Sequence, residues 1–124
     1  MSNSVTDSTP SVRQIMRGYP EETILACAEF KATRRDDSFE RAFAGIITHH
    51  LLQPPAQPVS AMPGTTRLVA DLGLDSLTMV EMVSIFEAIF GVRLRADDFA
   101  SVRTLDELRA LLRRKTQLPA RASA

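Results

Sequence analysis

Ser76 stands where a side chain could carry a covalently attached group. It follows Asp75, a residue type that caps helices by accepting a hydrogen bond from the first turn. Gly73, shortly before, permits a tight turn. A serine that begins a helix is exposed at the end of a loop, near the positive pole of the helix dipole. A phosphodiester on Ser76 would therefore lie in a favourable field.

A helix that starts at Ser76 is the element that must hold this serine in place. Its apolar residues recur on one side, and Gly91 fits the position just after a helix end. Residues 53–66 contain four prolines and form a long connection before this helix. Such connections without regular structure are often functional.

Two helices are predicted before that connection. Pro20, followed by two glutamates, begins an extra helix over residues 20–35. A second helix begins near Asp37, with Glu40 three residues later as in a capping box. Apolar residues at helical spacing follow, so this second helix belongs to the core.

The last helix has a clear start, because Thr104 and Glu107 form a second capping-box pattern. The order of elements predicts an all-α fold, a small helical bundle of three long helices plus one short helix, with an extra N-terminal helix. Within the leader, Val12–Met16 are the residues that could be ordered. The expected parts are a disordered leader (1–19), the extra N-terminal helix (20–35), the helical bundle (36–116) and a disordered tail (117–124).

Composition excludes several kinds of site. The chain has 124 residues and one cysteine, Cys27, so a disulfide within the chain and a cysteine-based metal site cannot form, and we expect no metal. The sequence shows neither a secretory signal pattern nor an apolar stretch near the roughly 18 residues of a membrane helix. We therefore expect a cytoplasmic protein without membrane insertion.

Charge is unevenly placed although the formal net charge is zero. Residues 68–98 hold six acids and two bases, whereas residues 101–124 hold six bases and two acids. The acidic middle segment indicates a basic protein partner rather than a nucleic acid. Solvated helix faces are the competing interpretation.

The segment Asp71-Leu72-Gly73-Leu74-Asp75-Ser76-Leu77 resembles the attachment signature of acyl carrier proteins, D-x-G-x-D-S-L. The resemblance extends over about residues 38–115. It implies that a phosphopantetheinyl transferase joins 4′-phosphopantetheine from coenzyme A to Ser76, and that Asp75 helps the transferase place the magnesium–coenzyme A complex. The thiol of this arm would then hold acyl groups as thioesters.

The resemblance also implies what the protein does with its cargo. It would be a monomeric carrier without catalytic activity, and it would deliver acyl groups to acyl-transferring and chain-modifying synthase enzymes. Fatty acid synthesis and specialised lipid or polyketide synthesis both remain open as its pathway. The helix that begins at the serine is the docking surface in this family, which places partner contacts on Leu77, Val80, Glu81, Ser84 and Glu87.

An acyl chain that folds back onto the bundle needs an apolar shelter, where burial contributes roughly 0.8 kcal/mol per methylene. The competing interpretation is that the residues of that shelter simply form a solid core. The expected shelter lies between helices and is lined by Phe43, Ile47, Leu72, Val80, Val83 and Phe86.

Two other classes of protein compete with the carrier. The segment 73–77 superficially resembles the G-D-S-L pattern of some hydrolases, but Leu74 interrupts it, and the possible bases are His49 and His50, expected to be exposed at a helix end. The second alternative is an unmodified helical protein-interaction module. Such a module would have the same amino-acid composition as a carrier of this size.

Overall fold

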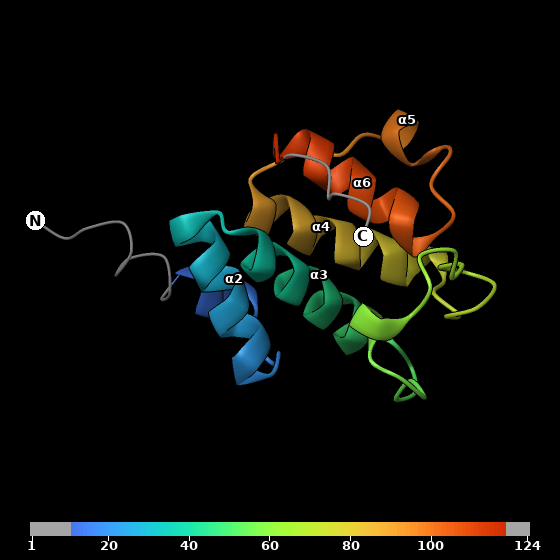
Figure 1. Ribbon diagram of the computed structural model, residues 1–124, viewed down its shortest axis with the longest axis horizontal. Helices are drawn as coiled ribbons and strands as arrows, with labels where there is room; N and C mark the ends of the chain where they lie inside the picture. Colours follow the sequence, from blue (N-terminus) through green and yellow to red (C-terminus); the bar gives the residue numbers. More distant parts are fainter. Residues whose placement is uncertain (1–10, 119–124) are drawn as a thin grey trace, which may run out of the picture.

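The computed structural model describes residues 11–118 and is helical throughout (Figure 1). This confirms the all-α prediction. Outside the helices, residues Arg67 and Thr104 form an isolated antiparallel bridge. Residues 11–15 are also helical. The further elements are α2 (Glu21–Thr33), α3 (Asp36–His50), the 3-10 turn η1 (Val59–Ala61), α4 (Ser76–Phe90), α5 (Ala96–Phe99) and α6 (Leu105–Lys115).

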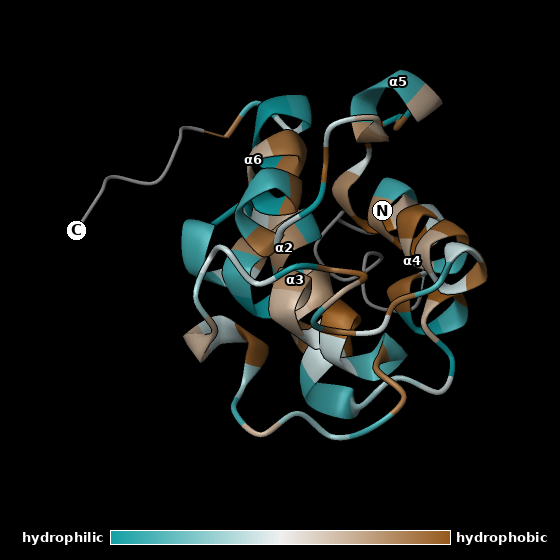
Figure 2. Cartoon of the chain, turned by 90° about the vertical axis from the view of Figure 1, so that its right-hand side faces the viewer, coloured by the Kyte–Doolittle hydropathy of each residue, from teal (hydrophilic) through white to brown (hydrophobic). Residues whose placement is uncertain are grey.

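Three long helices, α3, α4 and α6, form the bundle, and α3 runs in the opposite direction to the other two (Figure 1). Aromatic rings join α3 to α4: the Phe43 and Phe86 ring centroids are 6.0 Å apart, and those of Phe39 and Phe90 are 5.0 Å apart. All four rings are buried. Figure 2 shows that α4 carries mostly hydrophobic residues, as expected for the central helix of the bundle.

The expected cap of α3 at Asp37 is wrong. Helix α3 begins at Asp36, so its N-cap is Arg35, two residues before Asp37, and that side chain makes no capping hydrogen bond. The Asp37 carboxylate instead accepts hydrogen bonds from Arg35 (3.0 Å) and Arg41 (3.5 Å). The two arginines therefore draw Asp37 into ion pairs within the first turn, where an acid is still favourable for the helix dipole.

The expected capping box of α6 is confirmed. The backbone N–H of Glu107 donates to Thr104 Oγ1 (3.2 Å), and the Thr104 N–H donates to Glu107 Oε1 (3.1 Å). A second backbone N–H, that of Arg103, donates to the same carboxylate oxygen at 2.7 Å. These bonds fix where α6 starts, and the loop before α4 packs against this point.

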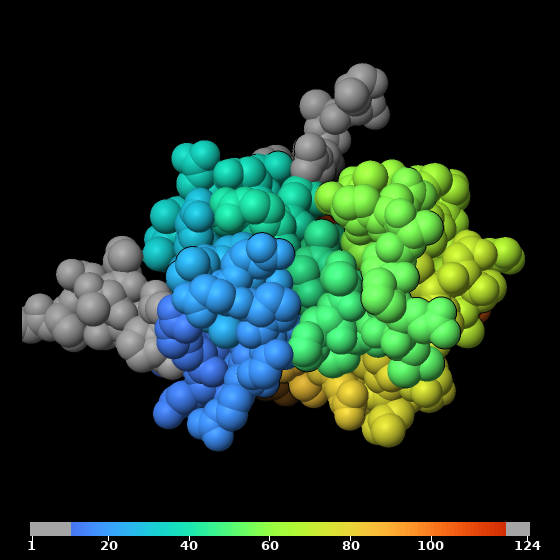
Figure 3. Space-filling view, turned by 90° about the horizontal axis from the view of Figure 1, so that it is seen from below, coloured from blue at the N-terminus to red at the C-terminus, as the bar shows by residue number. Residues whose placement is uncertain are grey.

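The N-terminal segment packs on the bundle, so the expectation of a disordered leader is wrong for residues 11–19. Val12 and Met16 are fully buried. Residues 1–10, and residues 119–124 of the expected tail, lie outside the described part. In Figure 3 the N-terminal segment (blue) lies on the same face as the 51–72 connection (green), on the other side of α3.

Helix α2 packs against α3 through a close contact between two small residues. A Cβ added to Gly45 would lie 2.5 Å from Thr23 Oγ1. Thr23 is buried, whereas Leu25 on the same helix is 48% exposed. Val12 and Met16 belong to the same buried core as Ala26, Cys27 and Phe30 of α2.

Candidate functional site

Ser76 is exposed and is the first residue of α4. Asp75 caps the helix, because its Oδ1 accepts the backbone N–H of Thr78 at 2.8 Å. This hydrogen bond holds the pKa of the Asp75 carboxyl below its usual value. Gly73, with φ +73°, supplies the left-handed turn before the cap. The serine is therefore presented at the positive end of a 15-residue helix.

Two buried leucines anchor the loop before Ser76 in the core of the bundle. Leu68 and Leu74 are 1% and 2% exposed, and the Leu74 N–H donates to the Leu68 carbonyl at 3.1 Å. The Leu68 N–H in turn donates to the carbonyl of Arg103, just before α6, at 2.9 Å. The attachment turn is thus tied to the start of α6, which limits how far Ser76 can move relative to the bundle.

The outer face of α4 next to Ser76 carries exposed apolar residues. Leu77 is 68% exposed and Val80 is 63% exposed, and both lie within the first turns after the serine. Glu81 and Ser84 are exposed on the same helix. These are four of the five residues expected to contact partners. They leave a surface that is apolar near the serine and weakly acidic farther along.

The fifth expected docking residue, Glu87, is used within the domain. Its Oε2 accepts the backbone N–H of Leu94 at 2.8 Å, and the side chain is only partly exposed. This bond ties the end of α4 to the segment that leads into α5. Sequence spacing placed Glu87 on the solvent face, but it could not show that the chain folds back over this residue after Gly91.

The expected acyl shelter is not an open space. Phe43, Ile47 and Phe86 are fully buried and form the solid core between α3 and α4. Val80, expected inside, is largely exposed. The remaining two, Leu72 and Val83, are partly buried and pack against the core. Aromatic packing fills the space between these helices, so the competing interpretation, a solid core, fits Phe43, Ile47 and Phe86.

An open groove of about 520 Å³ lies instead between α4 and α5, and Ser76 lines one end of it. Val80 and Val83 belong to both the expected shelter and this groove. The polar residues are Ser76, Ser84, Glu87 and Arg95, and the apolar residues are Met79, Val80, Val83, Leu94, Ala96 and Phe99.

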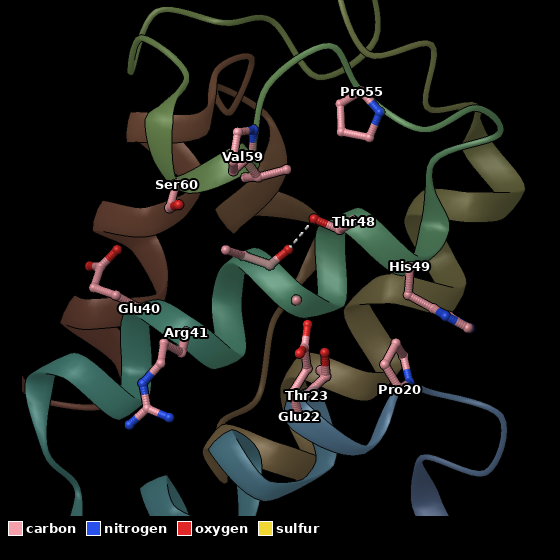
Figure 4. A pocket seen from close by; sticks show the side chains of 13 residues that line it. Pro20, Glu22, Thr23, Glu40, Arg41, Thr48, His49, Pro55, Val59 and Ser60 are labelled. Carbon is pink, nitrogen blue, oxygen red and sulfur yellow. Dashed lines mark hydrogen bonds between the residues drawn. The ribbon is translucent and has the colours of Figure 1, made fainter.

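A second cavity, of about 510 Å³, lies between α2, α3 and η1 (Figure 4). Ser76 does not line it. Two of its charged residues are engaged elsewhere: Arg41 pairs with Glu29 (3.2 Å), and Glu40 pairs with Arg109 (3.0 Å). Chemistry at Ser76 therefore has the α4–α5 groove as its neighbour.

A ring cluster at the end of α3 was not expected from the sequence. Tyr19 stacks on His49 with ring centroids 3.9 Å apart, and its hydroxyl is 2.6 Å from Nε2 of His50. Burial raises the pKa of Tyr19 to about 12 and lowers the pKa of His50. His49 is exposed as expected, but His50 is half-buried. Tyr19 stands immediately before Pro20, and no spacing rule links it to residues thirty positions away.

Two absences concern cofactors and membranes. Within residues 11–118, histidine, cysteine and acidic side chains do not gather into a cluster that could hold a metal ion. In the same part of the chain, none of the helices has the length and apolar character needed to span a bilayer.

Cys27 is a free thiol that is fully buried, and burial raises its pKa to about 12.

Comparison with known families identifies the segment around Ser76. Residues 57–112 match the family described as the phosphopantetheine attachment site. The match confirms the carrier-protein resemblance, over a shorter range than the expected residues 38–115. Domains of this family carry covalently attached 4′-phosphopantetheine and are generally carriers without catalysis. No curated protein and no solved structure matches the chain.

Proposed function

Since residues 57–112 are a phosphopantetheine-binding domain of the kind found in acyl carrier proteins, we propose that Ser76 is the attachment point and that the protein carries acyl groups as thioesters on the arm. The observation that carries this proposal is the position of Ser76. It is an exposed serine at the start of α4, behind a capping aspartate, within the matched segment.

Attachment requires only that Ser76 be presented to a transferase. The serine oxygen forms a phosphodiester with phosphopantetheine while the pyrophosphate bond of coenzyme A breaks. The serine proton leaves to a base of the transferase, and the adenosine part leaves as the bisphosphate. The helix dipole of α4 stabilises the negative charge of the product. We propose that Asp75 keeps this turn in place through its bond to Thr78 and takes part in positioning the metal–coenzyme A complex.

Partner enzymes are proposed to dock on the outer face of α4. Leu77 and Val80 offer exposed apolar surface beside the attachment point, and Glu81 and Ser84 continue it. Because Glu87 is engaged with Leu94, apolar contact contributes more than charge to recognition. The partners proposed are a phosphopantetheinyl transferase and enzymes that load, modify and remove acyl chains in fatty acid, specialised lipid or polyketide synthesis.

The apolar part of a cargo is proposed to rest in the groove between α4 and α5. Its floor is formed by residues such as Val83, Leu94 and Phe99, and Ser76 lies at its end. A chain tethered at Ser76 can reach this groove without passing through the core. Each methylene that leaves water there contributes roughly 0.8 kcal/mol. The buried, free Cys27 agrees with the reducing, cytoplasmic setting that we propose.

Intact-mass measurement tests the attachment point. The unmodified protein is incubated with coenzyme A and a broad-specificity phosphopantetheinyl transferase. The wild type should gain the mass of one arm, and Ser76→Ala should gain none. Ser101→Ala is the matched control, because it removes an exposed serine hydroxyl within the matched segment but away from the docking face and the groove. It should be modified like the wild type.

Circular dichroism of all three proteins shows whether they fold. A folded wild type that gains no arm would refute the carrier proposal and favour an unmodified interaction module. An arm on Ser76→Ala would place the attachment elsewhere.

A further inference from the structure

The groove beside Ser76 is not uniformly apolar. Arg95 and Glu87 line it together with Ser84 and a floor of hydrophobic residues. A groove for plain hydrocarbon gains nothing from an arginine in its wall, because an alkyl chain has no hydrogen-bond acceptor. The polar residues that line the groove therefore indicate which chemical groups its cargo contains.

Arg95 is available to a ligand. Its backbone N–H donates to Asp98 Oδ2 at 2.8 Å, which fixes the main chain at the start of α5. Its side chain is exposed, and within residues 11–118 it makes no ion pair. Asp98 pairs with Lys115 at 3.2 Å, and within residues 11–118 neither Asp97 nor Asp98 forms an ion pair with the Arg95 side chain. Arg95 lines the groove, and its guanidinium carries five N–H donors that a ligand there could accept from.

Glu87 sets the charge balance of the groove. One of its oxygens accepts the Leu94 N–H, and the carboxylate lies in the same lining as Arg95. The two charges offset each other, so a cargo with a full negative charge meets attraction and repulsion together. A neutral carbonyl oxygen accepts a charge-assisted hydrogen bond from Arg95 without that repulsion.

We propose that the α4–α5 groove selects acyl groups with a carbonyl oxygen beyond the thioester, such as 3-oxoacyl chains, and that Arg95 is the residue that determines this specificity. The proposal rests on the proposed carrier function. Among the cargoes of such carriers, the groove would bind oxygenated acyl chains better than fully reduced ones. An aminoacyl cargo fits less well, because its ammonium group would face the guanidinium.

The test compares cargoes of equal length on the full chain. The wild type, Arg95→Gln and Arg93→Gln are loaded by a broad-specificity transferase with amide-linked coenzyme A analogues that carry hexanoyl, 3-oxohexanoyl or adipoyl groups. Thermal midpoints and the NMR shifts of the Val83 and Leu94 methyl groups are measured for each form. Arg93 is the matched control, because it is exposed nearby but does not line the groove.

In the wild type, the 3-oxohexanoyl form should melt about 2 to 5 °C above the hexanoyl form, as expected for one partly exposed charge-assisted hydrogen bond in a chain of this size. This difference should persist in Arg93→Gln and disappear in Arg95→Gln. Larger shifts of the Val83 and Leu94 methyl groups should accompany it.

Three results would overturn the proposal. The first is equal thermal midpoints for the hexanoyl and 3-oxohexanoyl forms of the wild type, and the second is a larger rise in midpoint for adipoyl than for 3-oxohexanoyl. The third is an equal fall in midpoint for every cargo in Arg95→Gln. The last would mean that Arg95 contacts the phosphodiester of the arm. Failure of all three proteins to accept any arm would instead refute the carrier function itself.

Discussion

The turn around Ser76 is the part of the molecule that single residues explain best. Asp75 accepts the Thr78 N–H and Gly73 adopts a positive φ, as residue type and order predicted. The cap and the turn at this site depend on neighbours within four positions, so the sequence contains the residues needed to recognise them. Glu87 shows the opposite case, since its bond to Leu94 depends on where the chain returns after the helix ends.

The half-buried histidine at the end of α3, His50, makes stability depend on pH. Burial lowers the pKa of His50, so the folded protein binds this proton less readily than the unfolded chain does. Nearby Glu81 opposes this effect, but it is the smaller influence. Stability should therefore fall as the pH drops through the ordinary histidine pKa of about 6.5 towards the lower folded value.

We expect the thermal midpoint of the wild type to fall between pH 7.5 and pH 5.5 by a few degrees more than that of His50→Gln. Glutamine can still accept the hydrogen bond from Tyr19, but it does not titrate in this range. Differential scanning calorimetry at both pH values measures the effect. An identical pH shift in the two proteins would show that His50 does not contribute it.

At the scale of helices, the caps of α4 and α6 were predictable, whereas the cap of α3 and the packing between helices were not. The starts of α4 and α6 agree with the sequence patterns, because their N-cap side chains accept local hydrogen bonds. The cap of α3 was missed, since the ion pairs of Asp37 with Arg35 and Arg41 replaced it. The space expected between α3 and α4 is filled by aromatic side chains, because apolar spacing cannot tell a filled interface from an open one.

The contact between α2 and α3 depends on the absence of a side chain at Gly45. We expect Gly45→Ala to lower the free energy of unfolding by about 1 to 3 kcal/mol, because the new methyl group would overlap Thr23. The better helix propensity of alanine, worth about 1 kcal/mol, offsets part of this cost. Urea unfolding followed by circular dichroism measures the change.

Thr23→Ala provides the matched background, since it removes the two side-chain atoms that would lie closest to the new methyl group. In this background Gly45→Ala should cost little or even stabilise the protein. An equal loss of unfolding free energy in both backgrounds would mean that the packing of α2 on α3 does not depend on the contact between Gly45 and Thr23.

At the scale of the whole molecule, the basic charge of the last helix has an internal explanation. Arg113 is buried and pairs with Asp36 and Glu40, and Arg109 pairs with Glu40 at 3.0 Å. The basic last helix therefore holds the acidic first turns of α3. Ion pairs between residues more than sixty positions apart cannot be assigned from local charge patterns, which is why solvated faces and partner surfaces were the interpretations considered.

Replacing Glu40 should show how much this cross-bundle network stabilises the fold. Glu40→Ala leaves Arg109 and Arg113, which are 18% and 5% exposed, with fewer partners. We expect a loss of about 2 to 4 kcal/mol in the free energy of unfolding, towards the range seen when one member of a buried pair is removed. Urea denaturation at low and high salt measures it, and most of the loss should persist at high salt.

Asp37→Ala serves as the control, because its pairs with Arg35 and Arg41 are exposed. This substitution should have little effect on stability. If the two variants were equally stable, the network would be unimportant for the fold.

The burial of Cys27 has a practical consequence for anyone who labels this protein. It is the single cysteine of the chain, and its thiol is inaccessible and stays protonated well above neutral pH. An attached arm would end in a thiol that projects into solvent. A maleimide dye or a spin label would then mark the arm alone, without any cysteine having to be removed by mutation. The native sequence is in this sense ready for spectroscopy of the arm and its cargo.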